Sequence, residues 1–181
     1  MPLVRQAVRV STATIVVCPP LPGSSASYDP ADVVDALLDD PRTSGLRTLS
    51  LEVPEPDAGD DARTVRAHWV AHLAIGLATS GAKAPVLLVL GGASGAMAAA
   101  VGFSQKAARR AVSGYVLVDA VVPPAESRAG DWPDAPVHYV ASPAADPLEA
   151  NQARLRGWAV HEVADAAPAT VADVIAAIAR G

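Results

Sequence analysis

The stretch VLLVLGGASGAMAAAVGF, residues 86–103, joins a hydrophobic run to a glycine-rich corner and then to an alanine-rich segment. The run is apolar at consecutive positions, which is typical of a strand covered on both faces. Alanine has the highest helix propensity, so the segment after the corner favours a helix. We therefore predict a strand over 85–91, a tight turn, and a helix over 93–110. The residue at the tip of the turn decides which chemistry the chain can support.

Similar patterns alternate along the rest of the chain. Runs rich in apolar and β-branched residues predict further strands at 13–18, 46–53, 113–120, 136–142 and 158–163. Segments of helical period predict helices at 30–38, 60–79, 147–155 and 168–180. This order predicts one domain over 1–181, of the α/β class: a doubly wound, mainly parallel sheet of about six strands with helices on both faces. In such sheets ligands bind beyond the carboxyl ends of the strands.

Composition narrows the functional classes. The net charge is −5 and the pI is near 5.2, so the chain lacks the positive field that holds nucleic acid. Cys18 is the only cysteine, which excludes an internal disulfide. Arginines interrupt the first apolar residues, and no apolar run reaches the roughly 20 residues of a membrane span. We expect a cytoplasmic protein that binds neither nucleic acid nor membrane, with no metal and no cofactor.

The corner and its surroundings resemble a known family. A strand ending in Gly91, a tight corner and a helix of small residues are similar to the nucleophile elbow of the α/β-hydrolases, whose consensus is Gly-x-Ser-x-Gly. The resemblance continues in TIVVCPPLPGSS before the corner and in GYVLVDAVVPP and PVHYVASPAADP after it. It implies the α/β-hydrolase fold and a Ser-His-Asp triad. The helical lid that the family usually inserts is absent, and a proline-rich connection over 121–136 stands in its place.

The elbow consensus fits the corner in two registers. Matching both glycines uses GGASG, residues 91–95, and places Ala93 at the nucleophile position. Keeping the serine uses GASGA, residues 92–96, and loses the second glycine. Small neighbours avoid collisions at a strained turn, so we favour Ala93 at the tip. Ser94 would then cap the following helix.

Other catalytic positions of the family are depleted. Asp146 matches the triad acid, but no histidine follows the last predicted strand, and His161 lies within that strand. The stretch that matches the oxyanion loop begins with two prolines, which have no N–H to donate. The remaining candidate donors there are Leu21, Gly23 and Ser24.

Three further features have a plain structural interpretation. His68 and His72 have the spacing of a metal pair on one helix face, but without an evident third ligand they favour a solvated face. Cys18 would be nucleophilic only with a lowered pKa, and we expect a small buried residue. His138 stands near the start of its predicted strand, where we expect a structural role.

Two functional hypotheses follow. In the favoured one, the chain has lost the triad and uses its crevice to bind a small molecule or a partner, or for non-hydrolytic chemistry. In the alternative, it is a small esterase or thioesterase in which Ser94 is the nucleophile, Asp146 the acid and His161 an unconventional base. The predicted crevice residues are Leu21, Gly23, Ser24, Gly92, Ala93, Ser94, Gly95, Asp119 and Trp132.

The missing lid also predicts an association surface. Without a lid, we expect apolar side chains to face solvent around the crevice, namely Leu21, Met97, Val121, Val122 and Trp132. A contiguous apolar patch of more than a few hundred Å² tends to mark an interface. We therefore expect a homodimer, or a small apolar or acyl-type molecule bound at this face.

Overall fold

The core of the molecule is a parallel sheet of six strands. In a computed structural model, which describes residues 11–25, 27–124 and 132–181, the strand order is β2-β1-β3-β4-β5-β6. Every neighbouring pair runs parallel. The strands are β1 (Thr14–Val17), β2 (Arg47–Ser50), β3 (Val86–Gly91), β4 (Val112–Val118), β5 (Val137–Ala141) and β6 (Ala159–Glu162). The predicted sheet is confirmed.

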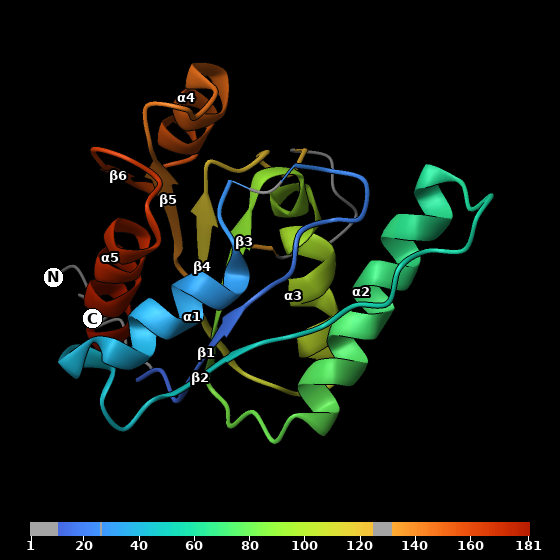
Figure 1. Cartoon of the computed structure of the whole chain (residues 1–181), viewed down its shortest axis with the longest axis horizontal. Helices are drawn as coiled ribbons and strands as arrows, with labels where there is room; N and C mark the ends of the chain where they lie inside the picture. The colour runs from blue at the N-terminus through green and yellow to red at the C-terminus, as the bar shows by residue number, and fades with distance from the viewer. Residues whose placement is uncertain (1–10, 26, 125–131) are drawn as a thin grey trace, which may run out of the picture.

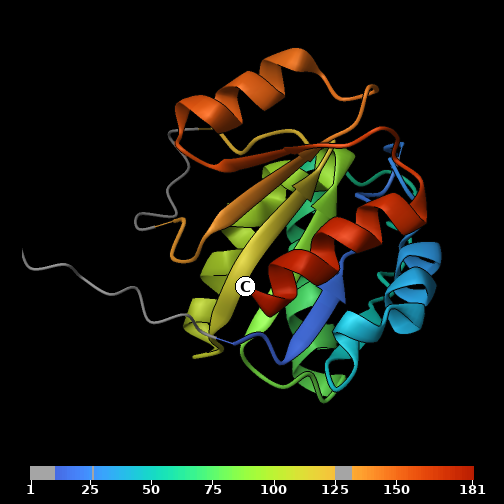
Figure 2. The same ribbon diagram turned by 90° about the vertical axis from the view of Figure 1, so that its left-hand side faces the viewer.

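Helices cover both faces of the sheet (Figures 1 and 2). One face packs against α1 (Pro30–Asp39) and α5 (Pro168–Arg180). The other packs against α2 (Ala62–Thr79), α3 (Ala98–Ala107) and α4 (Pro147–Leu155). The chain runs from β1 outward to β2 and then returns to β3 beside β1, so the winding reverses between β1 and β3. The loops that leave these two strands therefore meet at the carboxyl edge of the sheet.

Several element bounds differ from the prediction. The helix predicted over 93–110 is two elements, a short 3-10 helix η2 (Gly92–Met97) and then α3. The strand predicted over 46–53 is limited to β2, because its one neighbour β1 has only four residues to pair with. Helix α2 begins at Ala62 because the carboxylate of Asp61 accepts a hydrogen bond from Thr64 N at 2.7 Å and caps it there.

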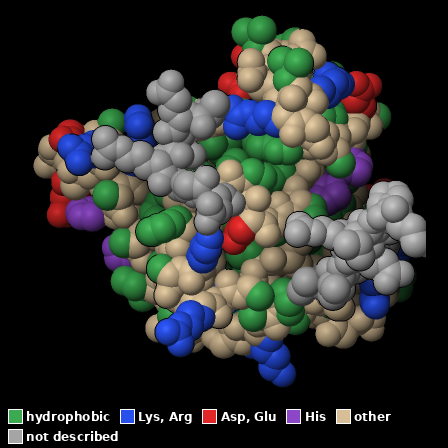
Figure 3. Space-filling view, turned by 180° about the vertical axis from the view of Figure 1, so that it is seen from behind, with side chains coloured by type: hydrophobic (Ala, Val, Ile, Leu, Met, Phe, Trp, Pro, Cys, Tyr) green, Lys and Arg blue, Asp and Glu red, His purple; other side chains and the backbone are tan. Residues whose placement is uncertain are grey.

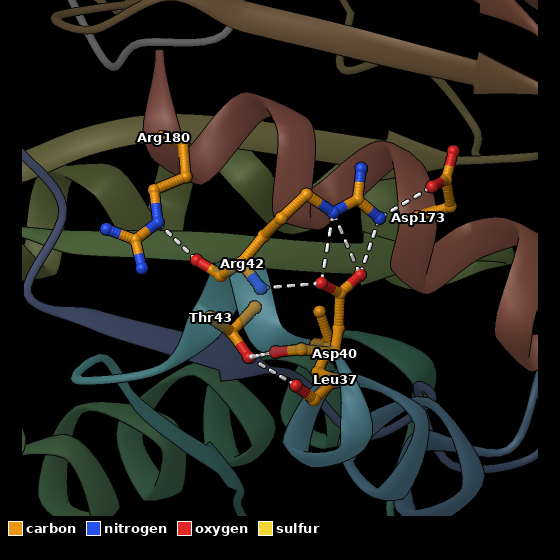
Figure 4. Close-up of polar contacts among 6 residues, drawn as sticks. All are labelled: Leu37, Asp40, Arg42, Thr43, Asp173 and Arg180. Carbon is orange, nitrogen blue, oxygen red and sulfur yellow. Dashed lines mark hydrogen bonds and ion pairs between the residues drawn. The ribbon is translucent and has the colours of Figure 1, made fainter.

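A polar cluster joins the two helices of one face (Figure 4). The Arg42 guanidinium lies between the carboxylates of Asp40 and Asp173, with N···O distances of 2.5 Å to each. Arg180 donates to the carbonyl oxygens of Arg42 and Ser44. Hydrogen bonds from Arg42 lower the pKa of Asp40. These contacts fasten the turn after α1 to α5.

The proline-rich connection has no helix in its described part, which comprises 121–124 and 132–136. Its remaining residues, 125–131, lie outside the described residues, so the lidless connection stays a prediction there. Among the helices of the described chain, none is long and apolar enough to cross a membrane.

Two helical glycines provide a matched test of how the layers pack. A Cβ on Gly102 would collide with the Tyr115 hydroxyl oxygen and lie 2.9 Å from Trp132 Cδ1, whereas the nearest atom to a Cβ on Gly76 is Leu51 Cδ2 at 3.4 Å. We predict that Gly102→Ala lowers the free energy of unfolding by about 1–3 kcal/mol, because the site is already full. Gly76→Ala should raise it by up to about 1 kcal/mol, through helix propensity. Urea denaturation of both variants measures this, and changes of the same sign would contradict the packing of α3 on β4.

Candidate functional site

The corner after β3 turns at Gly92. This residue has φ +54°, whereas Ala93 and Ser94 both keep a negative φ. Neither predicted register is therefore right, since the left-handed residue lies one position before Ala93. Strand β3 ends at Gly91, as predicted, where Gly91 pairs with Val118 as the last pair of the β3–β4 ladder, and the turn falls on the very next residue instead of one residue further on. Glycine adopts this conformation without the steric cost that a side chain brings.

Side chains and backbone of neighbouring segments lie close to the glycines of the corner. A Cβ on Gly91 would lie 2.5 Å from Tyr28 Cε1, and one on Gly92 would lie 3.0 Å from the carbonyl oxygen of Ser25. On the other side, a Cβ on Gly95 would lie 2.5 Å from that of Ala120. The loop after β1 and the segment after β4 thus close on the corner from both sides.

Ser94 is buried and serves the backbone of the corner. Its Oγ accepts a hydrogen bond from Gly91 N at 3.1 Å and donates one to Gly91 O at 2.8 Å. Its side chain has no exposed surface. The expected N-cap role is corrected: Gly91 occupies the cap position of η2, and Ser94 folds back onto it.

The other two proposed triad residues, Asp146 and His161, also form hydrogen bonds with groups outside the triad. The Asp146 carboxylate caps α4 by accepting from Leu148 N at 2.9 Å. His161 Nε2 lies 3.1 Å from His138 Nδ1 on the neighbouring strand, with the two rings stacked at 5.3 Å between centroids. Both histidines lie in strands, as predicted. Within the described residues, no hydrogen bond connects Ser94, Asp146 and His161 to one another.

Comparisons with known proteins place this geometry in a fold. The NocB thioesterase domain, solved as a covalent complex with a fluorophosphonate nocardicin G analogue, matches with a TM-score of 0.58 and 18% identity over 96% of both chains. An α/β-hydrolase from Vibrio vulnificus matches with a TM-score of 0.60 and 16% identity over 91% of this chain and 73% of that one. The chain has the α/β-hydrolase fold. A tomato methylketone synthase I variant, complexed with β-ketoheptanoate, matches with a TM-score of 0.60 and 11% identity over 94% of this chain and 98% of that one. No protein-family model and no curated protein sequence matches it.

In this α/β-hydrolase fold, Ser24 in the loop after β1 forms hydrogen bonds within the loop itself. Both the N–H and the hydroxyl of Ser24 donate to Leu21 O, at 3.0 and 2.6 Å. Gly23, with φ +76°, forms the bend between them. Pro20 O accepts from the indole Nε1 of Trp69 at 3.1 Å. One of the three expected donors of this loop, the Ser24 N–H, is therefore already used within it.

Asp119 links the ends of two strands. It follows β4 with φ 44°, and its carboxylate accepts from Ser142 N at 2.7 Å and from Ser142 Oγ at 2.6 Å. Both carboxylate oxygens are engaged. The residue therefore fixes the carboxyl ends of β4 and β5 relative to each other.

The residues beneath the corner form an apolar, closed pocket. Burial raises the pKa of Cys18 to about 12, so the thiol stays protonated, as expected for a structural cysteine. Burial, with Cys18 nearby, also raises the pKa of Tyr28. The space bounded by Cys18, Tyr28 and Gly91 has no room for a water molecule.

His68, one member of the predicted histidine pair on α2, lies near an aspartate. His68 Nδ1 lies 3.7 Å from Asp60 Oδ2, and the described residues contain no group of three side chains suited to hold a metal ion.

The predicted apolar patch around the crevice is interrupted. Val121 is 42% exposed, but Val122 is buried. Trp132 packs edge-on against Tyr115 and Trp158, towards the amino end of the sheet. The predicted patch is therefore not continuous, and Trp132 does not line the crevice.

Sequence reasoning missed one constellation, at the start of β6. There the Arg156 guanidinium lies 5.2 Å from the centroid of the Trp158 ring, next to Trp132. The only signal was the arginine two positions before a tryptophan, ahead of a strand.

Ser94→Ala tests the structural role of the serine. We predict a loss of about 1–3 kcal/mol in the free energy of unfolding, because the substitution leaves the buried polar groups of Gly91 without partners. Thr79→Ala is the matched control: that hydroxyl donates to Ile75 O on an exposed helix face, and we expect a change within about 0.5 kcal/mol. Chemical denaturation compares them, and an unchanged stability for Ser94→Ala would contradict the assigned hydrogen bonds.

The histidine pair predicts a pH dependence of stability. Burial, and then the charge of His161, lower the pKa of His138, while an unfolded chain titrates near 6.5. The unfolded state therefore binds more protons just below that pH, so stability is complete above it and falls as pH drops towards the lowered value. We expect His138→Gln to flatten this fall and the exposed His72→Gln to keep it. Unfolding curves between pH 7.5 and 5 check this; parallel curves for both variants would refute it.

Proposed function

We propose that this α/β-hydrolase-fold chain acts by binding and not by hydrolysis. The observation that carries the proposal is Gly92 at the left-handed position of the strand–helix corner. In the elbow consensus the nucleophile stands on that strained turn. A residue with no side chain offers no oxygen or sulfur to attack a carbonyl.

The other two candidate triad residues support the same proposal. A histidine and an acid help only when they orient and activate a nucleophile. Asp146 caps α4, and His161 is hydrogen-bonded to another histidine. The expected ligand, a small apolar or acyl-type molecule, and the expected second copy of the chain remain proposals. So does residence in the cytoplasm.

Hydrolysis by Ser94 is the second candidate. It is favoured by the structural likeness to a thioesterase domain and to an α/β-hydrolase. For this chemistry the Ser94 hydroxyl would have to leave both of its hydrogen bonds with Gly91 and become accessible.

A fluorophosphonate reagent separates the two candidates. We expect no covalent adduct by intact mass, and p-nitrophenyl butyrate turnover equal to the buffer rate, because the corner presents no activated nucleophile. An unrelated serine esterase in the same assay controls for reagent quality. An adduct that maps to Ser94 and disappears in Ser94→Ala, together with ester turnover, would overturn the proposal.

A further inference from the structure

A cavity of about 620 Å³ lies at the amino ends of β5 and β6. The first residues of both strands line it, together with the turn from Arg156 to Trp158 and with Pro124, Trp132, Pro133, Ala135 and Pro136. All six strands are parallel, so this cavity opens at the opposite end of the sheet from Gly92. Figure 3 shows hydrophobic and basic side chains side by side below the lobe that α4 forms.

Aromatic side chains that pack against one another form part of the walls of this cavity. Trp132 and Trp158 meet edge to face, with centroids 5.6 Å apart and planes at 89°. The Trp132 ring also packs edge-on against the Tyr115 ring, with centroids 5.4 Å apart and planes at 72°. Tyr115 in turn donates to Asp134 at 2.8 Å. Because these rings are already held in place, a ligand would not have to order them on binding.

The one charged side chain among the described lining residues is positive. Arg156 is the only Lys, Arg, Asp or Glu among its described lining residues, in a chain of net charge −5. No carboxylate of the described residues forms an ion pair with Arg156, and its guanidinium rests over Trp158. Arg154, two residues earlier, is by contrast paired with Glu162 at 2.5 Å. An unpaired guanidinium beside an apolar wall favours an anion that also has apolar surface.

His138 adds a second polar group. It lines the cavity, and its Nδ1 is taken by His161, which leaves Nε2 without a partner among the described residues. A planar anion that stacks on indole or proline surfaces would use the apolar walls, which a bare inorganic anion cannot.

We propose that this cavity is a binding site for a small planar aromatic anion, such as an aromatic carboxylate, with its charged group at Arg156 and its ring against the walls formed by Trp132 and Trp158. The site lies apart from the Gly92 corner and stands whether or not Ser94 is catalytic. This proposal names a class of ligand for the chain, and it does not depend on the function proposed for the Gly92 corner.

Calorimetric titration with 2-naphthoate tests the proposal. We expect saturable binding with a dissociation constant below about 1 mM. The neutral isostere 2-naphthamide should bind about tenfold more weakly, because it cannot form the charge-assisted contact. Inorganic phosphate should not displace the naphthoate at equal concentration. No binding, equal binding of the amide, or displacement by phosphate would each overturn the proposal.

Variants locate the site. Arg156→Gln should weaken naphthoate binding about tenfold and leave weak amide binding unchanged, because only the charge is removed. Arg66→Gln, on exposed α2 surface, is the matched control and should bind as the wild type does. Trp158→Leu should weaken both ligands. Circular dichroism verifies that each variant is folded, and wild-type affinity in Arg156→Gln would place the anion elsewhere and refute the assignment.

Discussion

The close approach of backbone segments around the corner between β3 and η2 organises the carboxyl end of the sheet. The loop after β1 reaches this corner through Tyr28 and Ser25, and the segment after β4 reaches it through Ala120. Hydrogen bonds fix both approaches, from Ser27 Oγ to Val118 O at 3.1 Å and from Val121 N to Gly92 O at 2.9 Å. Glycine at 91, 92 and 95 is what allows three chain segments to occupy one small volume.

The same close packing determines what the polar side chains nearby can do. Backbone groups buried at such a junction need hydrogen-bond partners. Ser94 supplies them for Gly91, and Asp119 supplies one for Ser142. The Ser94 hydroxyl and the Asp119 carboxylate are thus both hydrogen-bonded to buried backbone at the carboxyl end of the sheet.

The sequence predicts the layers well because consecutive apolar strands and periodic helices are local signals. It predicts the end of β3 at Gly91 correctly but not the residue at the tip of the corner, because Ser25 and Tyr28 approach the two glycines from the loop after β1, and the local pattern does not contain that contact. The pairing of His138 with His161 is likewise a cross-strand contact. Trp132 lies in a proline-rich stretch with no periodicity, so nothing in its surroundings indicates that it packs towards the amino end of the sheet.

The two ends of the sheet differ because their connections differ. At the carboxyl end, the loops after β1, β3 and β4 converge on glycines, and the space bounded by Cys18, Tyr28 and Gly91 cannot hold a water molecule. At the amino end, β5 follows the described residues 132–136, which form neither helix nor strand, and β6 follows the tight turn at Gly157, which has φ 73°. Irregular backbone cannot pack as closely as a helix against its neighbours, so the aromatic side chains brace one another and leave a cavity between them. In the described part of the chain, the cavity of about 620 Å³ thus lies at the end of the sheet where the connections are least regular.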